Sequence, residues 1–389
     1  MKWDCKKRSL FLAVALTLRP LPAAAAEEPM VRVALLQGAE SARLTIQAPC
    51  RVSDLRSGKE LARWPTLKWQ EARASESGVR IGPAEFASAA VVLEPTKPNV
   101  LIRVNAQPYR GRLILRRGPD GKLMVVDWLP LEDYLVGALT SETSSRWPLE
   151  ALKAHAVVSR TMVAHRIWIR KSEPYDVTAD VSTHVYHGAA AERATTRQAV
   201  NETRGQVLAY GGELFSASFH ANCGGYTEDA AELWSVKEEM PPLKGGPDPY
   251  CEGLKHYRWE ADVGRTEWER TLGTTAQQVG TLEDAEVVER NRSGRVRTIL
   301  LKGSRGSVTL TGRRLREMLG ANLLRSLKFD VSVAPGKIHF SGLGWGHGVG
   351  MCQWGAYGMA HEGHKMEEIL SAYFPGADRR RLKGLPGFS

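Results

Sequence analysis

Along the first third of the chain, hydrophobic residues alternate with polar ones in short runs, which is the pattern of half-buried β-strands. Such runs occupy residues 31–36, 43–48, 79–81, 90–93, 100–104 and 113–115. The segment Arg117-Gly118-Pro119-Asp120-Gly121 follows the last run and has the composition of a hairpin turn. The pattern predicts an N-terminal β-rich region over residues 27–126.

The hydrophobic period then changes to that of a helix. Between Leu131 and Leu139, apolar residues recur at i, i+3, i+4, i+7 and i+8, and Pro130 suits the first helical position. Glu142 continues the same face at i+11, after which residues 143–147 break the pattern. A second helix is predicted to open at Pro148. We therefore expect a helical pair with a carboxylate at the end of the first apolar face.

Beyond the helical pair the pattern is extended again. Strands are predicted at 205–210, 214–220 and 299–310, and a short helix at 313–319. Residues 341–351 have glycine at every second position. A strand there would have one face without side chains, which another backbone or a flat sugar ring could approach closely.

These elements predict an α+β fold, with an N-terminal β-rich region followed by a mixed domain of a helical pair and antiparallel strands. We place the mixed domain, which would be the catalytic one, at 127–376. A β-rich insertion is expected within it at 255–335, and a basic C-terminal tail at 377–389. Of the 389 residues, 43% are hydrophobic and 25% charged, which excludes disordered and collagen-like classes.

Charge and the N-terminus indicate the compartment. The net charge is +10, of which +4 lies in the first 26 residues. The remaining basic excess is dispersed, so it suits an anionic polymer and not nucleic acid, which usually requires a clustered basic stripe. Residues 1–26 have the basic start, apolar run and alanine-rich end of a secretory signal, a disordered apolar tail being the alternative. No other stretch suits a membrane span, so we expect an exported protein of the periplasm or cell envelope.

Export changes how the cysteines are interpreted, because disulfides form in oxidising compartments. Cys5 lies in the signal segment, and Cys223 and Cys251 both stand beside turn-forming residues. A disulfide between Cys223 and Cys251 is predicted, leaving Cys50 and Cys352 as free, buried thiols.

Two spacings leave a zinc site open. His220 and Cys223 have the spacing of a ligand pair, and His184 and His187 form a second pair without a nearby cysteine. Because structural zinc sites normally have four ligands, we assign no metal ligand from these pairs and expect no cofactor.

Glu142 is the candidate catalytic group. Burial disfavours the charged form of a carboxyl and raises its pKa toward the range in which it donates a proton at neutral pH. The alternative is a structural glutamate at a helix end, solvated or paired with Arg146. Glu150, one turn into the second helix, is the rival carboxylate.

Four motifs in order carry a resemblance to a known family. They are residues 129–135 with Glu142, 147–157 with 159–161, 219–220 with 224–228, and 344–351 with 353–356. From about residue 31 to 376 the chain resembles the stage II sporulation protein D (SpoIID/LytB-like) family. It departs from the family at Cys352, where serine is common, and at His155 and His184, where glutamine is common.

The resemblance implies a peptidoglycan lytic transglycosylase. Such enzymes cleave the bond between N-acetylmuramic acid and N-acetylglucosamine and leave a 1,6-anhydro end, with a glutamate at the position of Glu142 as the general acid/base. The partner would be the glycan strands of peptidoglycan. Substrate-binding positions are carried over onto Arg160, His220, Thr227, Trp345, His347, Gly348, Gln353 and Trp354.

Two other interpretations remain open. The family also contains amidase enhancers, so the protein could be a non-catalytic glycan-binding module that stimulates a separate cell-wall amidase. A zinc-dependent hydrolase using His220 and Cys223 is the third.

Overall fold

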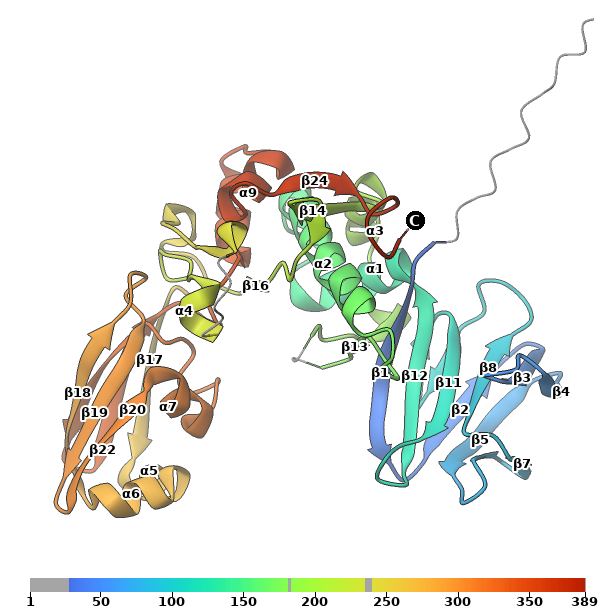
Figure 1. Ribbon diagram of the computed structural model, residues 1–389, viewed down its shortest axis with the longest axis horizontal. Coiled ribbons are helices and arrows are strands. Elements are labelled where there is room, and N and C mark those ends of the chain that lie inside the picture. Colours follow the sequence, from blue (N-terminus) through green and yellow to red (C-terminus); the bar gives the residue numbers. More distant parts are fainter. Residues whose placement is uncertain (1–27, 181–182, 235–239, 389) are drawn as a thin grey trace, which may run out of the picture.

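The computed structural model describes residues 28–180, 183–234 and 240–388, and the predicted secretory signal at 1–26 lies outside them. Two β-rich lobes stand on either side of a central part that contains α1, α2, α3 and α9 (Figure 1). The α+β prediction is confirmed. Among the described residues, no helix combines the length and the apolarity needed to cross a bilayer.

The N-terminal lobe consists of two sheets that share one hydrophobic core. One sheet has the order β13-β1-β12-β11-β8-β3-β4 and the other β10-β9-β2-β5-β6-β7. The strands are β1 (Met30–Ala39), β2 (Ala42–Ile46), β3 (Cys50–Asp54), β4 (Glu60–Trp64), β5 (Leu67–Ala74), β6 (Val79–Ile81), β7 (Ala84–Phe86), β8 (Ala90–Pro95), β9 (Ile102–Val104), β10 (Gln107–Tyr109), β11 (Arg112–Arg117), β12 (Leu123–Pro130) and β13 (Val177–Thr178). The six predicted strands in this region are present, and the predicted turn joins β11 to β12.

The central part contains the predicted helical pair. Its elements are α1 (Leu131–Glu142), α2 (Leu149–Ile169), η1 (Gly188–Ala191), α3 (Ala194–Glu202), β14 (Gln206–Tyr210), β15 (Glu213–Leu214), β16 (Phe219–His220), α4 (Ala230–Trp234), η2 (Pro241–Leu243), η3 (Pro249–Cys251), β23 (Met351–Cys352), α8 (Gln353–His361), α9 (Met366–Tyr373) and β24 (Asp378–Arg381). The strand predicted at 214–220 is interrupted between β15 and β16. The basic tail is partly structured, because β24 pairs antiparallel with β14.

The third lobe is built from residues between β17 and β22. Its elements are β17 (Arg258–Gly264), α5 (Arg265–Leu272), α6 (Thr274–Val279), β18 (Leu282–Arg290), β19 (Val296–Gly303), β20 (Gly306–Thr311), α7 (Gly312–Leu319), β21 (Phe329–Ala334) and β22 (Lys337–Leu343). They form the sheets β17-β22-β21 and β18-β19-β20 around a separate core. The predicted helix at 313–319 is confirmed as α7.

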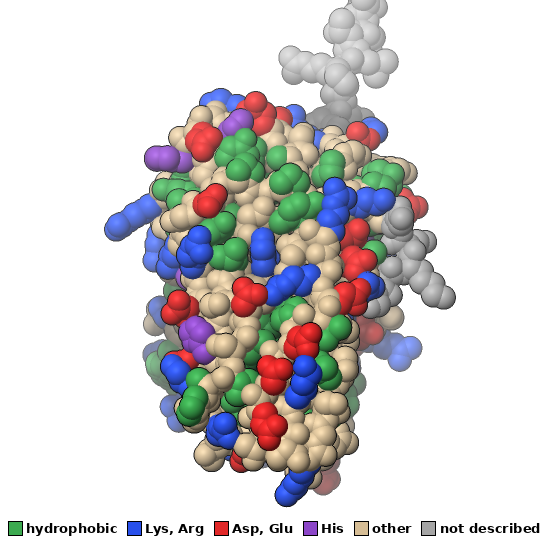
Figure 2. All heavy atoms as spheres, turned by 90° about the vertical axis from the view of Figure 1, so that its left-hand side faces the viewer, with side chains coloured by type: hydrophobic (Ala, Val, Ile, Leu, Met, Phe, Trp, Pro, Cys, Tyr) green, Lys and Arg blue, Asp and Glu red, His purple; other side chains and the backbone are tan. Residues whose placement is uncertain are grey.

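The outward side of this lobe has no dominant charge. Figure 2 shows basic and acidic side chains intermixed on the face turned to the viewer. Ion pairs within the lobe have the same character, as in Arg297 with Glu289 and Lys302 with Glu286.

The glycine-rich segment is not the continuous strand that its alternation predicted. β22 ends at Leu343, and residues 344–350 form an irregular loop before β23. Gly346 and Gly348 have φ angles of 119° and 92°, which L side chains rarely adopt. The alternation therefore reflects a backbone with repeated positive φ, and not a strand with one bare face.

Candidate functional site

Glu142 is the last residue of α1, and its half-buried carboxylate faces the segment after residue 182. The Val185 N–H donates a hydrogen bond to Glu142 Oε1 at 2.9 Å. Burial raises the pKa of Glu142, and the bond from Val185 offsets only part of that rise. Within the described chain no Lys or Arg forms an ion pair with Glu142, so the alternative of a pair with Arg146 is not realised.

A buried row of side chains links this helix end to α8. The Tyr134 hydroxyl lies 2.8 Å from His184 Nδ1, and the His184 ring stacks on Phe219 with centroids 5.5 Å apart. Phe219 meets His155 edge-on at 4.5 Å, and Gln353 Nε2 donates to His155 Nε2 at 3.2 Å. The row therefore connects α1, α2, β16 and α8 beside the candidate catalytic carboxylate.

Both histidines of this row are neutral at physiological pH. Burial lowers the pKa of His155 and of His184 to about 3. Neither side chain therefore supplies a positive charge that would hold the pKa of Glu142 down.

The rival carboxylate of Glu150 has a different environment. Its Oε1 accepts from Lys153 Nζ at 2.8 Å, and its Oε2 accepts from the Met366 N–H at 2.8 Å at the start of α9. Partial burial acts to raise the pKa of Glu150, but Lys153 and the Met366 N–H outweigh it and the pKa is lowered. Glu150 therefore stays ionised and connects α2 to α9.

Partly exposed aromatic side chains run from the α1–α2 loop to the glycine-rich loop. Trp147 meets Trp354 at 5.0 Å and Tyr357 at 5.3 Å. His256 lies 6.5 Å from the Trp354 ring and 4.6 Å from the Trp345 ring. We call these five residues the aromatic row. Trp345 and Trp354 were predicted as substrate-binding residues, whereas Trp147, Tyr357 and His256 were not.

The glycine-rich loop holds two more predicted substrate-binding residues, His347 and Gly348, and a third, His220, lies beside it on β16. His220 donates from Nδ1 to the Val349 carbonyl at 3.2 Å, and its ring lies 5.5 Å from that of His347. His347 Nδ1 in turn accepts from the Val349 N–H at 3.0 Å. At Gly348 a Cβ would collide with the guanidinium of Arg295, which explains the glycine sterically. His220 is buried, but His347 reaches a hollow of about 290 Å³ that Arg313 and Arg316 also line.

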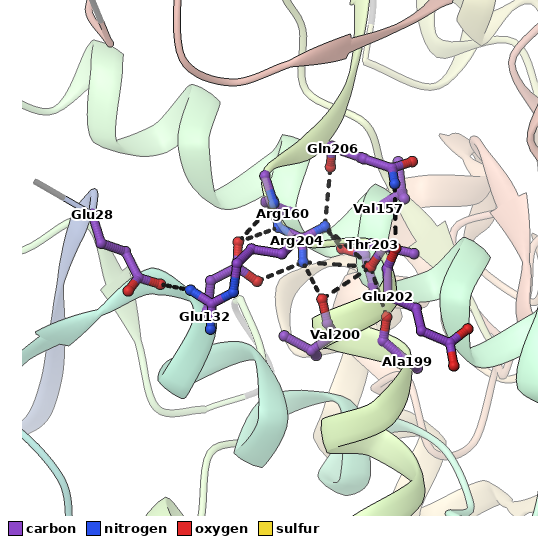
Figure 3. A network of polar contacts seen from close by, with 12 residues as sticks. Glu28, Glu132, Val157, Arg160, Ala199, Val200, Glu202, Thr203, Arg204 and Gln206 are labelled. Carbon is purple, nitrogen blue, oxygen red and sulfur yellow. Dashed lines mark hydrogen bonds and ion pairs between the residues drawn. The ribbon is translucent and has the colours of Figure 1, made fainter. Parts of the chain in front are cut away.

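Arg160 does not belong with the substrate-binding residues. Its side chain is 0% exposed and makes a two-pronged ion pair with Glu132, at 2.8 Å from Nε to Oε1 and 2.6 Å from NH2 to Oε2. It also donates to the Gln206 carbonyl at 3.0 Å, and Figure 3 shows the resulting network. No glycan can reach this guanidinium, so the prediction for Arg160 is wrong.

Thr227 is likewise occupied by the backbone. It is buried, and its hydroxyl donates to the Gly246 carbonyl at 3.1 Å while accepting from the Gly246 N–H at 2.8 Å. The hydroxyl therefore closes a local loop and has both of these hydrogen bonds to the backbone of Gly246.

The predicted disulfide is absent from the structure. Cys223 and Cys251 are free thiols whose Sγ atoms lie 3.4 Å apart. A third sulfur, from Cys352, and the carboxylate of Asp248 converge on the same point, with all four donor atoms within 4.8 Å of one another. The sequence reasoning missed both of these residues as neighbours of the pair.

The histidines of the two spacings that left a zinc site open do not lie in a set of three or more ligands among the described residues. His220 turns its Nδ1 to a carbonyl and is not part of the Cys223 cluster. His184 contacts Tyr134 and Phe219, and the described residues around it offer no set of three ligands.

Comparison with known proteins finds two matching family models and several similar proteins. The family model of the stage II sporulation protein (SpoIID) matches residues 119–210, and a domain of unknown function (DUF8618) matches residues 244–350. An uncharacterized protein of Brachyspira hyodysenteriae is 30% identical over 354 residues, which cover 91% of this chain and 93% of that protein.

Two named relatives from Bacillus subtilis are similar to part of the chain. Stage II sporulation protein D is 28% identical over 267 residues, covering 64% of this chain and 74% of the relative. The amidase enhancer is 29% identical over 287 residues, covering 62% of this chain and 39% of the relative. With the motifs around Glu142 inside the matched region, the chain belongs to the SpoIID family.

Proposed function

We propose that this protein is an exported lytic transglycosylase that cleaves the glycan strands of peptidoglycan, with Glu142 as its general acid/base. Family membership and the similarity to an amidase enhancer support a role at the cell wall. The observation that carries the catalytic part is the environment of Glu142: a half-buried carboxyl with a raised pKa and one backbone hydrogen bond.

One carboxyl is sufficient for this reaction. Protonated Glu142 gives its proton to the glycosidic oxygen as the bond from C1 to that oxygen breaks. The carboxylate then takes the proton of the C6 hydroxyl while the C6 oxygen bonds to C1, so the product is a 1,6-anhydro end and the carboxyl is regenerated. No water is consumed, so the second carboxylate that hydrolysing glycosidases use is not required.

The surroundings of Glu142 suit both steps. A raised pKa keeps the proton available at the start, and the Val185 N–H fixes one carboxylate oxygen. The aromatic row offers partly exposed ring faces within the same part of the molecule, beginning at Trp147, five residues beyond Glu142. Such faces suit the apolar sides of sugar rings and would hold a glycan strand in register.

The test is the chemistry of the products. Purified protein is incubated with isolated sacculi and with defined glycan strands, and the released fragments are analysed by mass spectrometry. We expect 1,6-anhydro ends from the wild type, and a rate at least ~100-fold lower from Glu142→Gln, which keeps the shape of the side chain but cannot exchange the proton. Glu150→Gln is the matched control and should cleave at close to the wild-type rate.

Other outcomes are equally informative. Reducing ends without the anhydro form would mean hydrolysis, and loss of activity only in Glu150→Gln would mean that the wrong acid is named. Glycan binding without cleavage, combined with stimulation of an added cell-wall amidase, would favour the non-catalytic amidase enhancer, which the similarity to that relative keeps as the second candidate.

A further inference from the structure

Three cysteines and one aspartate from separate segments meet in the core of the central part. Cys223 follows β16, Asp248 and Cys251 belong to the turn at η3, and Cys352 ends β23 directly before α8. The exposed fractions are 0% for the three cysteines and 2% for Asp248. Their four donor atoms lie within 4.8 Å of one another.

We propose that these four residues form a closed, structural zinc site. Zinc in structural sites is tetrahedral, with bonds of about 2.3 Å to cysteine sulfur and about 2.0–2.2 Å to carboxylate oxygen. Ligand atoms on such a tetrahedron are separated by somewhat less than twice the bond length. The 3.1 Å from Cys223 Sγ to Asp248 Oδ2 and the 3.4 Å between the sulfurs of Cys223 and Cys251 fit this arrangement after small shifts.

The groups around the donors match what bound thiolates and carboxylates need. The N–H groups of Cys223 and Gly355 both donate to Cys352 Sγ, at 3.2 and 3.3 Å. The Tyr373 hydroxyl donates to Asp248 Oδ2 at 3.0 Å, and the Tyr250 N–H donates to Oδ1 at 3.1 Å. Such outer partners orient metal ligands and are part of a working site.

Positive charge is also available close by. Three thiolates and a carboxylate exceed the charge of one zinc ion, so the site would be negative overall. The buried guanidinium of Arg295 donates to the Cys223 carbonyl at 2.9 Å, and Lys328 Nζ donates to the Gly224 carbonyl at 2.8 Å. Both cations therefore lie against the loop that carries the first ligand.

A disulfide between Cys223 and Cys251 is the competing state, and it explains less. It would leave the thiol of Cys352 without a function and the carboxylate of Asp248 buried without a counter-ion, which is costly. Zinc uses all four groups, with the thiols losing their protons on binding. With four protein ligands and no exposed donor, the site has no open position for a substrate or water, which assigns it a structural and not a catalytic role.

The position of the site gives it a consequence for its neighbours. Gln353, which contacts His155 in the buried row, follows Cys352 directly, and His220 lies three residues before Cys223. Zinc would thus tie together the chain segments behind the candidate active site. This inference does not depend on the proposed transglycosylase activity.

The experiment measures metal and not cleavage. The full chain is purified under reducing conditions without chelator, and zinc is quantified by mass spectrometry. We expect about one zinc per chain, and after replacement by Co²⁺ the visible absorption of a tetrahedral thiolate complex. Cys352→Ser and Asp248→Asn should lose most of the metal, whereas Cys50→Ala, which removes a buried thiol outside the cluster, should keep it.

A finer variant protects the test against misfolding. Tyr373→Phe removes only the hydroxyl that holds Asp248, and should weaken zinc binding about 10–100-fold in competition with a chelator. The inference is overturned if the reduced wild-type protein binds no added Zn²⁺, or if peptide mapping of the protein isolated without reductant finds Cys223 bonded to Cys251. Cys352→Ser binding zinc as tightly as the wild type would overturn it as well.

Discussion

Each end of helix α1 carries a buried or half-buried glutamate, and the two carboxylates have opposite electrostatic environments. Near the start, Glu132 accepts two hydrogen bonds from the Arg160 guanidinium (Figure 3). It also accepts one from the Gly205 N–H. At the other end, Glu142 has one backbone N–H and neutral histidines nearby. A carboxylate paired with a cation stays ionised and stabilises the fold. A buried carboxylate without a cationic partner has a raised pKa and can exchange a proton.

The largest expected change in stability comes from removing the Arg160 partner of Glu132. Arg160→Leu leaves Glu132 buried without its partner, and should lower the free energy of unfolding by about 3–5 kcal/mol. Denaturant unfolding of the variant measures this loss. The double variant Glu132→Leu with Arg160→Leu should recover much of it, because an apolar pair leaves no uncompensated charge. An Arg160→Leu protein as stable as the wild type would show that the pair is not structural.

A smaller loss of stability is expected at Glu150, which, like Glu132, has a cationic partner. Glu150→Ala removes the acceptor of the Met366 N–H at the start of α9 and the partner of Lys153. We expect a loss of about 1 kcal/mol in unfolding free energy, as for the removal of a helix cap, and unchanged glycan cleavage. Thermal unfolding measures the stability and the product assay measures the cleavage. A large loss of cleavage would show that Glu150 takes part in the reaction.

The smallest effect is a gain, and it sharpens the contrast. Because burial raises the pKa of Glu142 in the folded protein above its ordinary value of 4.5, folding favours the protonated form. Its contribution to stability is complete below the unfolded pKa and is lost as pH rises through the folded pKa. Glu142→Gln does not titrate, so it should be more stable than the wild type at neutral pH, with the difference vanishing at about pH 3.5. Equal stability at both pH values would contradict a raised pKa.

Much of the fold follows from local pattern. Prolines 130 and 148 and a 3.6-residue period were sufficient to predict the helical pair, and the phase of α1 placed Glu142 on its buried side. β12 was not predicted because it is buried on both faces, so its sequence is a run of apolar residues, interrupted by Asp127, that does not alternate with polar ones. The edge strand β4 escaped for the opposite reason, since it buries almost nothing.

The site was harder to predict, because its decisive contacts join distant segments. Arg160 forms an ion pair with Glu132, which lies 28 residues earlier on another helix. The spacing of the two residues in the sequence does not reveal this pairing. Cys352 joins Cys223 across 129 residues, so a turn context identified two of the sulfurs and missed the third. The glycine alternation was visible, but the same pattern serves a bare strand face and a loop of positive φ angles equally well.

The attachment of the third lobe bears on how the molecule moves. Its chain enters by β17 and leaves by β22, which are hydrogen-bonded neighbours, and such a connection alone would act as a hinge. The second sheet of the lobe is fastened too, because Arg295 donates to the Cys223 and Tyr226 carbonyls and Ser293 donates to Glu228. Swinging the lobe would break charge-assisted bonds of a buried guanidinium, at a cost of about 1.5–3 kcal/mol each. The third lobe is therefore attached to the central part at two places, and any change in its orientation would have to break these bonds as well as bend the β17–β22 connection.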